Sequence, residues 1–146
     1  GLQITVSSIG TGMFKGKTIK GFPELAYFNG LRESRQMFME ATFGKVVLPE
    51  GMKLVSHSMF AHAVGDTVIL PSTITALDEL VFWECKIKII VIKSPQVIDA
   101  SAYWCLLTPY PVEKVYVPDN LVESYKAEKW WSLHKDYIRP LSEYQP

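Results

Sequence analysis

Phenylalanine returns along this chain at a nearly fixed interval, and this spacing constrains the fold more than any other feature of the sequence. The members of the row are Phe14, Phe38, Phe60 and Phe82, at steps of 24, 22 and 22 residues. The row is expected to continue at Tyr103 or Trp104, 21 or 22 residues further on. A repeat of this length is a small unit that cannot bury its own apolar side chains, so successive units must stack on one another.

A β-prone segment keeps the same step. Runs rich in valine and isoleucine occur at 46–49, 68–71, 90–93 and 115–118, and these residues favour the pleated surface of a sheet. Repeats of about 20–29 residues that each contribute a short strand are typical of leucine-rich-repeat proteins. The sequence therefore predicts a leucine-rich-repeat solenoid, α/β to mainly β. It would have about five short-strand and turn repeats, each 22–24 residues long, closed by a C-terminal helical cap.

The repeat pattern ends before the C-terminus, which predicts two parts within a single domain of residues 1–146. Residues 1–111 would form the repeats, and 112–146 the last strand and the C-terminal cap. After Pro118, Asp119 is a candidate N-cap. Apolar residues at helical spacing follow it, namely Leu121, Val122, Tyr125 and Trp130. Trp130 and Trp131 supply apolar area to cover the last unit, and we expect at least one of them in the core.

Three motifs together resemble the BspA-like leucine-rich repeats of bacterial surface proteins. They are Phe22-Pro23-Glu24-Leu25-Ala26-Tyr27-Phe28, rows of the form V-x-x-I-x-x-x-x-F, and the closing stretch Val115-Tyr116-Val117-Pro118-Asp119, which runs on to Tyr125 and Trp130-Trp131. The resemblance covers essentially the whole chain. It implies a right-handed solenoid, export to the bacterial cell surface, and a role in adhesion or recognition. The family has no catalytic motif, so the resemblance predicts a protein that is not an enzyme.

Location is predicted from this resemblance alone. It implies an extracellular or cell-surface protein, whereas Gly1-Leu2-Gln3-Ile4 lacks the basic start and apolar region of a signal peptide. The mode of anchoring, for example a lipid upstream of this chain, is left open. No run of 18 apolar residues that could span a bilayer is present in the sequence.

The charge balance argues against nucleic acid as a partner. Lysine and arginine total 15, aspartate and glutamate also total 15, and the formal net charge is zero. Binding to a phosphate backbone normally rests on an excess of basic residues that displace counterions. The sequence has no such excess.

The segment Gly10–Thr18 is similar to a phosphate-binding P-loop, because it ends in Gly16-Lys17-Thr18. A P-loop needs four residues between its two glycines, followed by a helix. Here Gly10 leaves five residues and Gly12 leaves three, and Gly21 and Pro23 would interrupt the helix. The repeat explains the segment without a nucleotide, with Phe14 in the core and Gly16 in the following turn. We therefore predict no nucleotide or other cofactor.

Histidine and cysteine are too few and too regularly spaced to predict a metal site. His57 is one repeat before Glu79 and His62 one repeat before Glu84, which places both at positions that accept charged residues. A metal site needs three or four ligands, and no cluster of that size is visible. Cys85 and Cys105 are 20 residues apart. They are interpreted either as buried thiols or as a disulfide between neighbouring units.

The repeat also predicts a binding surface on the outer face of the sheet. If valines and leucines at 46, 48, 68 and 70 point inward, the residues between them point outward. The predicted outward row is apolar and consists of Val47, Ile69, Val91 and Tyr116, flanked by Lys45, Thr67 and Lys114. An exposed apolar ladder would mark an interaction site. The alternative is that another segment of the chain covers it.

The leading functional hypothesis is therefore a non-enzymatic recognition or adhesion module that binds a protein or host-matrix partner through the sheet face. A glycan is the alternative ligand, since exposed aromatic side chains could stack on sugar rings. The aromatic candidates for this role are Tyr110, Trp130, Trp131 and Tyr144. A third alternative is a structural spacer within a larger surface protein. Exposed Trp and Tyr pairs beside polar groups would favour the glycan.

Overall fold

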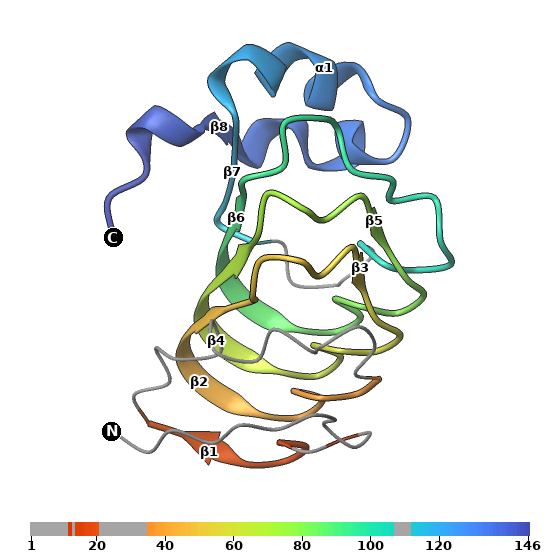
Figure 1. The fold of residues 1–146 in the computed structure, drawn as a ribbon, viewed down its shortest axis with the longest axis vertical. Coiled ribbons are helices and arrows are strands. Elements are labelled where there is room, and N and C mark those ends of the chain that lie inside the picture. Colours follow the sequence, from red (N-terminus) through yellow and green to blue (C-terminus); the bar gives the residue numbers. More distant parts are fainter. Residues whose placement is uncertain (1–11, 13, 21–34, 107–111) are drawn as a thin grey trace.

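The computed structural model describes residues 12, 14–20, 35–106 and 112–146, and its centre is a sheet of six parallel strands (Figure 1). In order across the sheet these are β1 (Thr18–Ile19), β2 (Thr42–Val47), β4 (Val64–Leu70), β6 (Lys86–Ile92), β7 (Lys114–Val117) and β8 (Ile138–Pro140). A second sheet pairs β3 (Leu54–Val55) with β5 (Ala76–Leu77). The strands of the main sheet therefore lie side by side in the same order as they follow one another along the chain.

Short helices lie across the C-terminal end of the sheet (Figure 1). They are η2 (Asp119–Leu121), α1 (Val122–Ala127), η3 (Trp131–Tyr137) and η4 (Leu141–Glu143). The expected N-cap at Asp119 is wrong, because no side chain caps η2 or α1. The Asp119 carboxylate instead accepts a hydrogen bond from the Ser142 backbone N–H at 2.9 Å. The Ser142 side chain and this backbone N–H, in that order, lower the pKa of Asp119 by hydrogen bonding to its carboxylate.

The predicted fold class, a leucine-rich-repeat solenoid of short-strand repeats with a helical cap, is wrong. The strands instead join into one parallel sheet whose central members β2, β4 and β6 have six or seven residues. The expected last strand is present as β7, but the expected cap region adds a further strand, β8, to the sheet. The all-parallel pairing is that of a Rossmann-like α/β core. However, turns and the β3–β5 pair occupy the connections between β2, β4 and β6, where such cores have helices.

Both faces of the sheet are buried, and this explains why buried and exposed residues do not alternate along its central strands. Val68, Ile69 and Leu70 are all buried, and so are Ile90, Val91 and Ile92. Parallel strands covered on both faces have continuous apolar runs of this kind. The prediction of alternating buried and exposed residues is therefore wrong for these runs.

The register of the sheet confirms the 22-residue period. Val46 pairs with Val68, and Val68 pairs with Ile90. Ile90 pairs with Val115, three residues beyond the regular step. Because equivalent residues lie directly opposite one another, the inward side chains of successive units form straight rows through the core.

The phenylalanine row forms a continuous stack inside the molecule. Phe14, Phe38, Phe60 and Phe82 follow one another with ring centroids 5.4, 5.3 and 5.6 Å apart and interplanar angles of 9°, 4° and 8°. These separations lie within the range of favourable ring stacking. The predicted core role of the four phenylalanines is confirmed.

The fifth place in this stack belongs to Leu106, so the prediction of Tyr103 or Trp104 there is wrong. The Phe60 N–H donates to the carbonyl of Val81, just before Phe82, and the Phe82 N–H donates to the carbonyl of Cys105, just before Leu106. The step from Phe82 to Leu106 is thus two residues longer than the preceding step. These two extra residues move both aromatic side chains out of the core.

Each unit turns a tight corner that uses left-handed backbone at two places four residues apart. The first place is occupied by Gly12, Gln36, Ser58, Leu80 and Trp104, and the second by Gly16, Glu40, His62 and Glu84, all with positive φ. L-residues other than glycine rarely adopt this conformation. Its recurrence shows that the corner geometry is imposed by the stacked units and not by the local residue type.

The C-terminal segment is fixed to the unit beneath it through Tyr125 and Trp131, both buried. The Tyr125 hydroxyl accepts a hydrogen bond from the Ile98 N–H at 3.1 Å and donates one to the Gln96 carbonyl at 3.3 Å. The Trp131 indole N–H donates to the Ile98 carbonyl at 2.9 Å. The prediction that at least one of Trp130 and Trp131 belongs to the core is confirmed.

None of the helices in the described residues is long and apolar enough to cross a membrane.

A candidate ligand-binding edge

The predicted binding row on the sheet is aligned as expected, but it is not an exposed ladder. Strand pairing places Val47 opposite Ile69, Ile69 opposite Val91, and Val91 opposite Tyr116. However, Ile69, Val91 and Tyr116 are only 6%, 0% and 6% exposed, and Val47 is half-buried. The prediction of an exposed apolar row is therefore wrong.

The chain's own C-terminal residues cover this row. Leu141 and Tyr144 pack against the cluster of Ile69, Val91 and Tyr116, and the rings of Tyr144 and Tyr116 are 5.2 Å apart. Among the flanking residues Thr67 is also buried, whereas Lys45 and Lys114 are exposed. The sheet face thus offers two lysines and no free apolar patch along this row.

The largest exposed aromatic side chains lie at the corners of the last units instead. We define the aromatic edge as His62, Trp83, Trp104 and Tyr103. Neighbouring rings in this order are 4.9, 6.4 and 5.3 Å apart. Tyr103 is 61% exposed and Trp104 43%. They form a continuous line of rings that solvent reaches.

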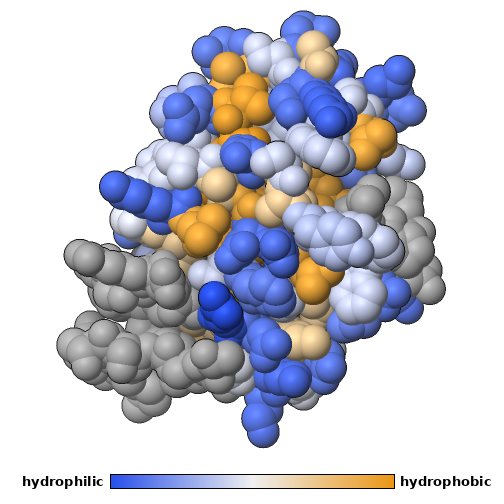
Figure 2. All heavy atoms as spheres, turned by 90° about the vertical axis from the view of Figure 1, so that its right-hand side faces the viewer, coloured by the Kyte–Doolittle hydropathy of each residue, from blue (hydrophilic) through white to orange (hydrophobic). Residues whose placement is uncertain are grey.

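The corner geometry explains why these side chains point outward. The Leu80 N–H donates to the Tyr103 carbonyl, so Tyr103 takes the place of Glu79, and Trp104 that of Leu80, in the unit below. Trp104 has a φ of 54° and His62 one of 56°. Figure 2 faces this side of the molecule and shows hydrophobic and pale side chains set among hydrophilic ones. The backbone conformation of the corners thus sets the outward direction of the rings.

A hollow of about 320 Å³ adjoins the aromatic edge. Its lining comes from both the last unit and the C-terminal segment: Ala100, Ser101, Ala102, Tyr103, Trp104, Cys105, Leu106, Trp130 and Leu133. Leu133 is 59% exposed. Lys129 lies over the Trp130 ring, 4.6 Å from its centroid. A mostly apolar hollow with a few polar groups is the usual form of a ligand site.

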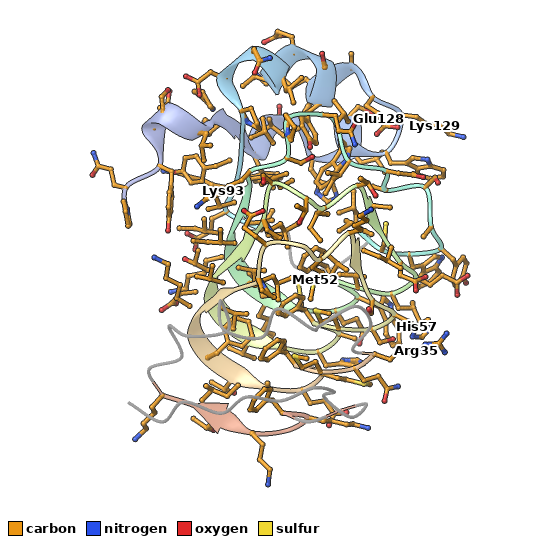
Figure 3. The ribbon with its side chains drawn as sticks, in the orientation of Figure 1. Arg35, Met52, His57, Lys93, Glu128 and Lys129 are labelled. Carbon is orange, nitrogen blue, oxygen red and sulfur yellow. The ribbon has the colours of Figure 1, made fainter. Side chains whose placement is uncertain are left out.

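Glu128 fixes the helical side of this hollow. Its Oε2 accepts hydrogen bonds from the backbone N–H groups of Trp130 at 2.8 Å and Trp131 at 2.9 Å. Glu128 and Lys129 come from the turn between α1 and η3, high on the same side as the corners (Figure 3). The Glu128 carboxylate therefore fixes the backbone from which the Trp130 side chain extends.

Charged side chains flank the aromatic edge in the positions that the repeat predicts. Glu79 lies 4.0 Å from His57, and Glu84 lies 3.3 Å from His62. The predicted one-repeat relation of each histidine to its glutamate is thus confirmed. Arg35 precedes His57 in the same row, since the next residue, Gln36, donates its backbone N–H to the His57 carbonyl.

The segment similar to a P-loop continues into a strand and not into a helix. Phe14 stacks on Phe38, Gly16 has a φ of 68°, and Thr18 begins β1. These observations confirm the interpretation by repeat position. Gly10, as well as Tyr110 and Phe22–Phe28, lies outside the described residues.

Within residues 12, 14–20, 35–106 and 112–146, no three histidine, cysteine or acidic side chains are grouped closely enough to hold a metal ion.

Cys85 and Cys105 form no disulfide, and their side chains are 0% and 1% exposed. This agrees with the interpretation as buried thiols and not with a disulfide. Burial raises the pKa of Cys85 to about 11 and that of Cys105 to about 12. Because the thiolate is the reactive form, both should be inert near neutral pH.

We therefore expect iodoacetamide to modify neither cysteine of the folded protein at pH 8, and both after denaturation. Mass spectrometry of the intact protein measures this directly. Folded stability should also fall as the pH rises above the ordinary thiol value of 9.0, since the unfolded thiols ionise first. Rapid alkylation of the native protein would contradict the buried positions.

A second hollow, of about 450 Å³, lies where β2, β4 and β6 begin. Its rim carries the exposed Asp66 and Lys88, whose side chains are 3.5 Å apart. Exposed pairs of this kind are mobile and contribute little binding energy. The aromatic edge is the better candidate for a ligand site, because its rings are positioned by the corner backbone and adjoin a mostly apolar hollow.

No protein-family model matches this chain, and none of the curated proteins is similar to it in sequence. The resemblance to BspA-like surface proteins therefore stays a prediction from the motifs alone.

Sequence reasoning missed the aromatic edge because Tyr103 and Trp104 were assigned to the core. One signal was present in the sequence. The step from Phe82 to Leu106 is as long as the step from Phe14 to Phe38, so Leu106 was an equally good continuation of the row.

Proposed function

We propose that this chain is a non-enzymatic recognition module that binds a protein partner through the aromatic edge and the adjoining hollow. The observation that carries this proposal is the exposed pair Tyr103 and Trp104, whose rings stack 5.3 Å apart beside Trp83. Tryptophan and tyrosine are enriched among the few interface residues that carry most of the binding energy. Solvent reaches both rings in this chain, so a partner can contact them.

The hollow supports the same proposal. Its volume of about 320 Å³ would accept one large apolar side chain of a partner between Trp104, Trp130 and Leu133. Anchor side chains that fill a pocket beside aromatic residues are typical of interface hot spots. A location at the cell surface, as the resemblance implies, fits a recognition role and is part of this proposal.

A glycan is the second candidate ligand. Tyr103 and Trp104 form an exposed aromatic pair next to Ser101, which is the arrangement expected of a sugar-binding surface. Of the four aromatic candidates from the sequence, Trp131 is buried and Tyr144 packs on Tyr116. Only Trp130 adjoins the hollow, and Tyr110 lies outside the described residues.

The proposal predicts that Trp104→Ala weakens the binding of selected peptides by about 30-fold, as expected for a hot-spot residue. Peptides would be selected on the wild-type protein from a random display library, and their affinities measured by calorimetry. Trp104 is 43% exposed, so the variant should fold normally, which thermal unfolding checks.

The control is the double variant Lys45→Glu/Lys114→Glu, which changes the two exposed lysines of the sheet face. It should bind the selected peptides as the wild type does. If the double variant lost peptide binding while Trp104→Ala kept it, the binding site would lie on the sheet face and not at the aromatic edge. A library that yields no binders, together with glycan-array signals that depend on Trp104, would replace the protein partner by a glycan.

A further inference from the structure

We infer that the aromatic edge recognises an arginine side chain presented by the partner. This inference rests on the proposed function and names the chemistry of the ligand at the same site. It follows from the carboxylates that surround the rings and from the way a guanidinium group binds aromatic faces.

Carboxylates lie on both sides of the line of rings. Glu79 occupies the row of Tyr103 one unit earlier, and Glu84 follows Trp83 directly. Their side chains are 54% and 43% exposed. Each has a histidine neighbour, His57 and His62 respectively, and the exposed part of each glutamate can still be reached by a cation from solution.

Negative charge also reaches the hollow itself. Burial is the main cause of the raised pKa of Cys105, one of the residues that line the hollow, and the carboxylates of Asp99 and Asp78 raise it further. The Asp99 carboxylate accepts the Ser101 N–H at 2.8 Å, which fixes it near the rim. Basic residues lie nearby as well: Lys129, held over Trp130, Lys86 at the start of β6, and Arg35, which shares a row with His57 and Glu79. Of the charged side chains named here, four are carboxylates and three are basic.

This combination selects a particular cation. A guanidinium group is planar, stacks on aromatic rings and donates hydrogen bonds to carboxylates at the same time. An ammonium group can only do the second well, because it is compact and strongly hydrated. The same carboxylates would repel phosphate and other anions. An arginine that stacks over Trp83 or Trp104 and directs its N–H groups toward Glu79 or Glu84 would use both the aromatic faces and the carboxylates.

A peptide titration followed by NMR tests the inference on the whole chain. The probe is acetyl-Gly-Arg-Gly-Arg-Gly amide, and its control is the same peptide with citrulline, a neutral isostere, in place of arginine. The readout is the indole N–H signals of Trp83 and Trp104, assigned from Trp83→Phe and Trp104→Phe. The buried Trp131 indole, bonded to Ile98, is an internal reference that should not shift.

We expect the arginine peptide to shift the Trp83 and Trp104 signals and to bind about two- to fivefold more tightly than the citrulline peptide. Glu79→Gln/Glu84→Gln and high salt should each remove this preference, whereas Glu143→Gln, an exposed carboxylate on η4, should not.

Two results would overturn the inference in different ways. Equal binding of the arginine and citrulline peptides at Trp83 and Trp104 would disprove recognition of arginine, but it would leave the proposed recognition site standing. No shift of either signal with the arginine peptide also overturns it. If the library peptides then bind Trp104→Ala as well as they bind the wild type, the proposed function fails too.

Discussion

Replacing Phe60 by alanine should lower the free energy of unfolding by about 3–5 kcal/mol, the usual cost of removing a buried phenylalanine. Phe60 is 0% exposed and stacks on Phe38 at 5.3 Å and on Phe82 at 5.6 Å. It also meets Phe43 edge to face at 5.9 Å. Its removal leaves a cavity in the middle of the stack that rigid neighbouring units cannot close. Chemical denaturation followed by circular dichroism measures the loss.

The matched control is Phe14→Ala, at the N-terminal end of the same stack. Phe14 is half-buried, so its truncation should cost clearly less than that of Phe60. Equal losses at the two positions would contradict a cost that depends on burial within the stack. A small effect of Phe60→Ala would mean that the units can slide together and fill the gap.

The second large effect is expected from one added methyl group. In Gly65→Ala the new Cβ would lie 2.6 Å from Cδ2 and 2.7 Å from Cζ of Phe43, with Cε2 closer still. Gly65 pairs with Phe43 in the sheet, and the ring of Phe43, 5% exposed, fills the space that a side chain at 65 would need. We expect a loss of about 3 kcal/mol or more, at the upper end for overpacked cores.

A double variant identifies the cause. Phe43→Leu alone should be destabilising, but Phe43→Leu/Gly65→Ala should be more stable than the sum of the two single losses predicts. This coupling is expected because the smaller side chain gives room for the new methyl group. Gly44→Ala is the control, since nothing lies within 4 Å of a Cβ at that neighbouring glycine. Strictly additive losses would show that Phe43 is not the residue that excludes a side chain at 65.

Much of the internal order of the molecule could be predicted from the sequence. The 22-residue step placed Val46, Val68 and Ile90 opposite one another and Phe38, Phe60 and Phe82 in one stack. It also assigned His57 and His62 to positions that accept charged residues, each one repeat before a glutamate. These predictions succeeded because they depend only on which residues occupy the same place in successive units, and the spacing along the sequence shows this directly.

The exposed face of the sheet could not be predicted in the same way. Alternation along a strand correctly placed Ile69 and Tyr116 on the outer side. It could not show that Leu141 and Tyr144, from the far end of the chain, return to cover them. Contacts between segments so distant in sequence leave no mark in a local pattern, so the predicted binding row proved to be buried.

The recurring phenylalanines by themselves determined the length of the unit and the residues that line the core, because a stacked unit must present the same apolar face each time. Only the tertiary structure decided which fifth residue completed the stack and which surfaces stayed free. Two extra residues before Leu106 let that side chain enter the core and turned Tyr103 and Trp104 outward. The choice depended on packing against the neighbouring unit, and it moved the candidate binding site from the sheet to the aromatic edge.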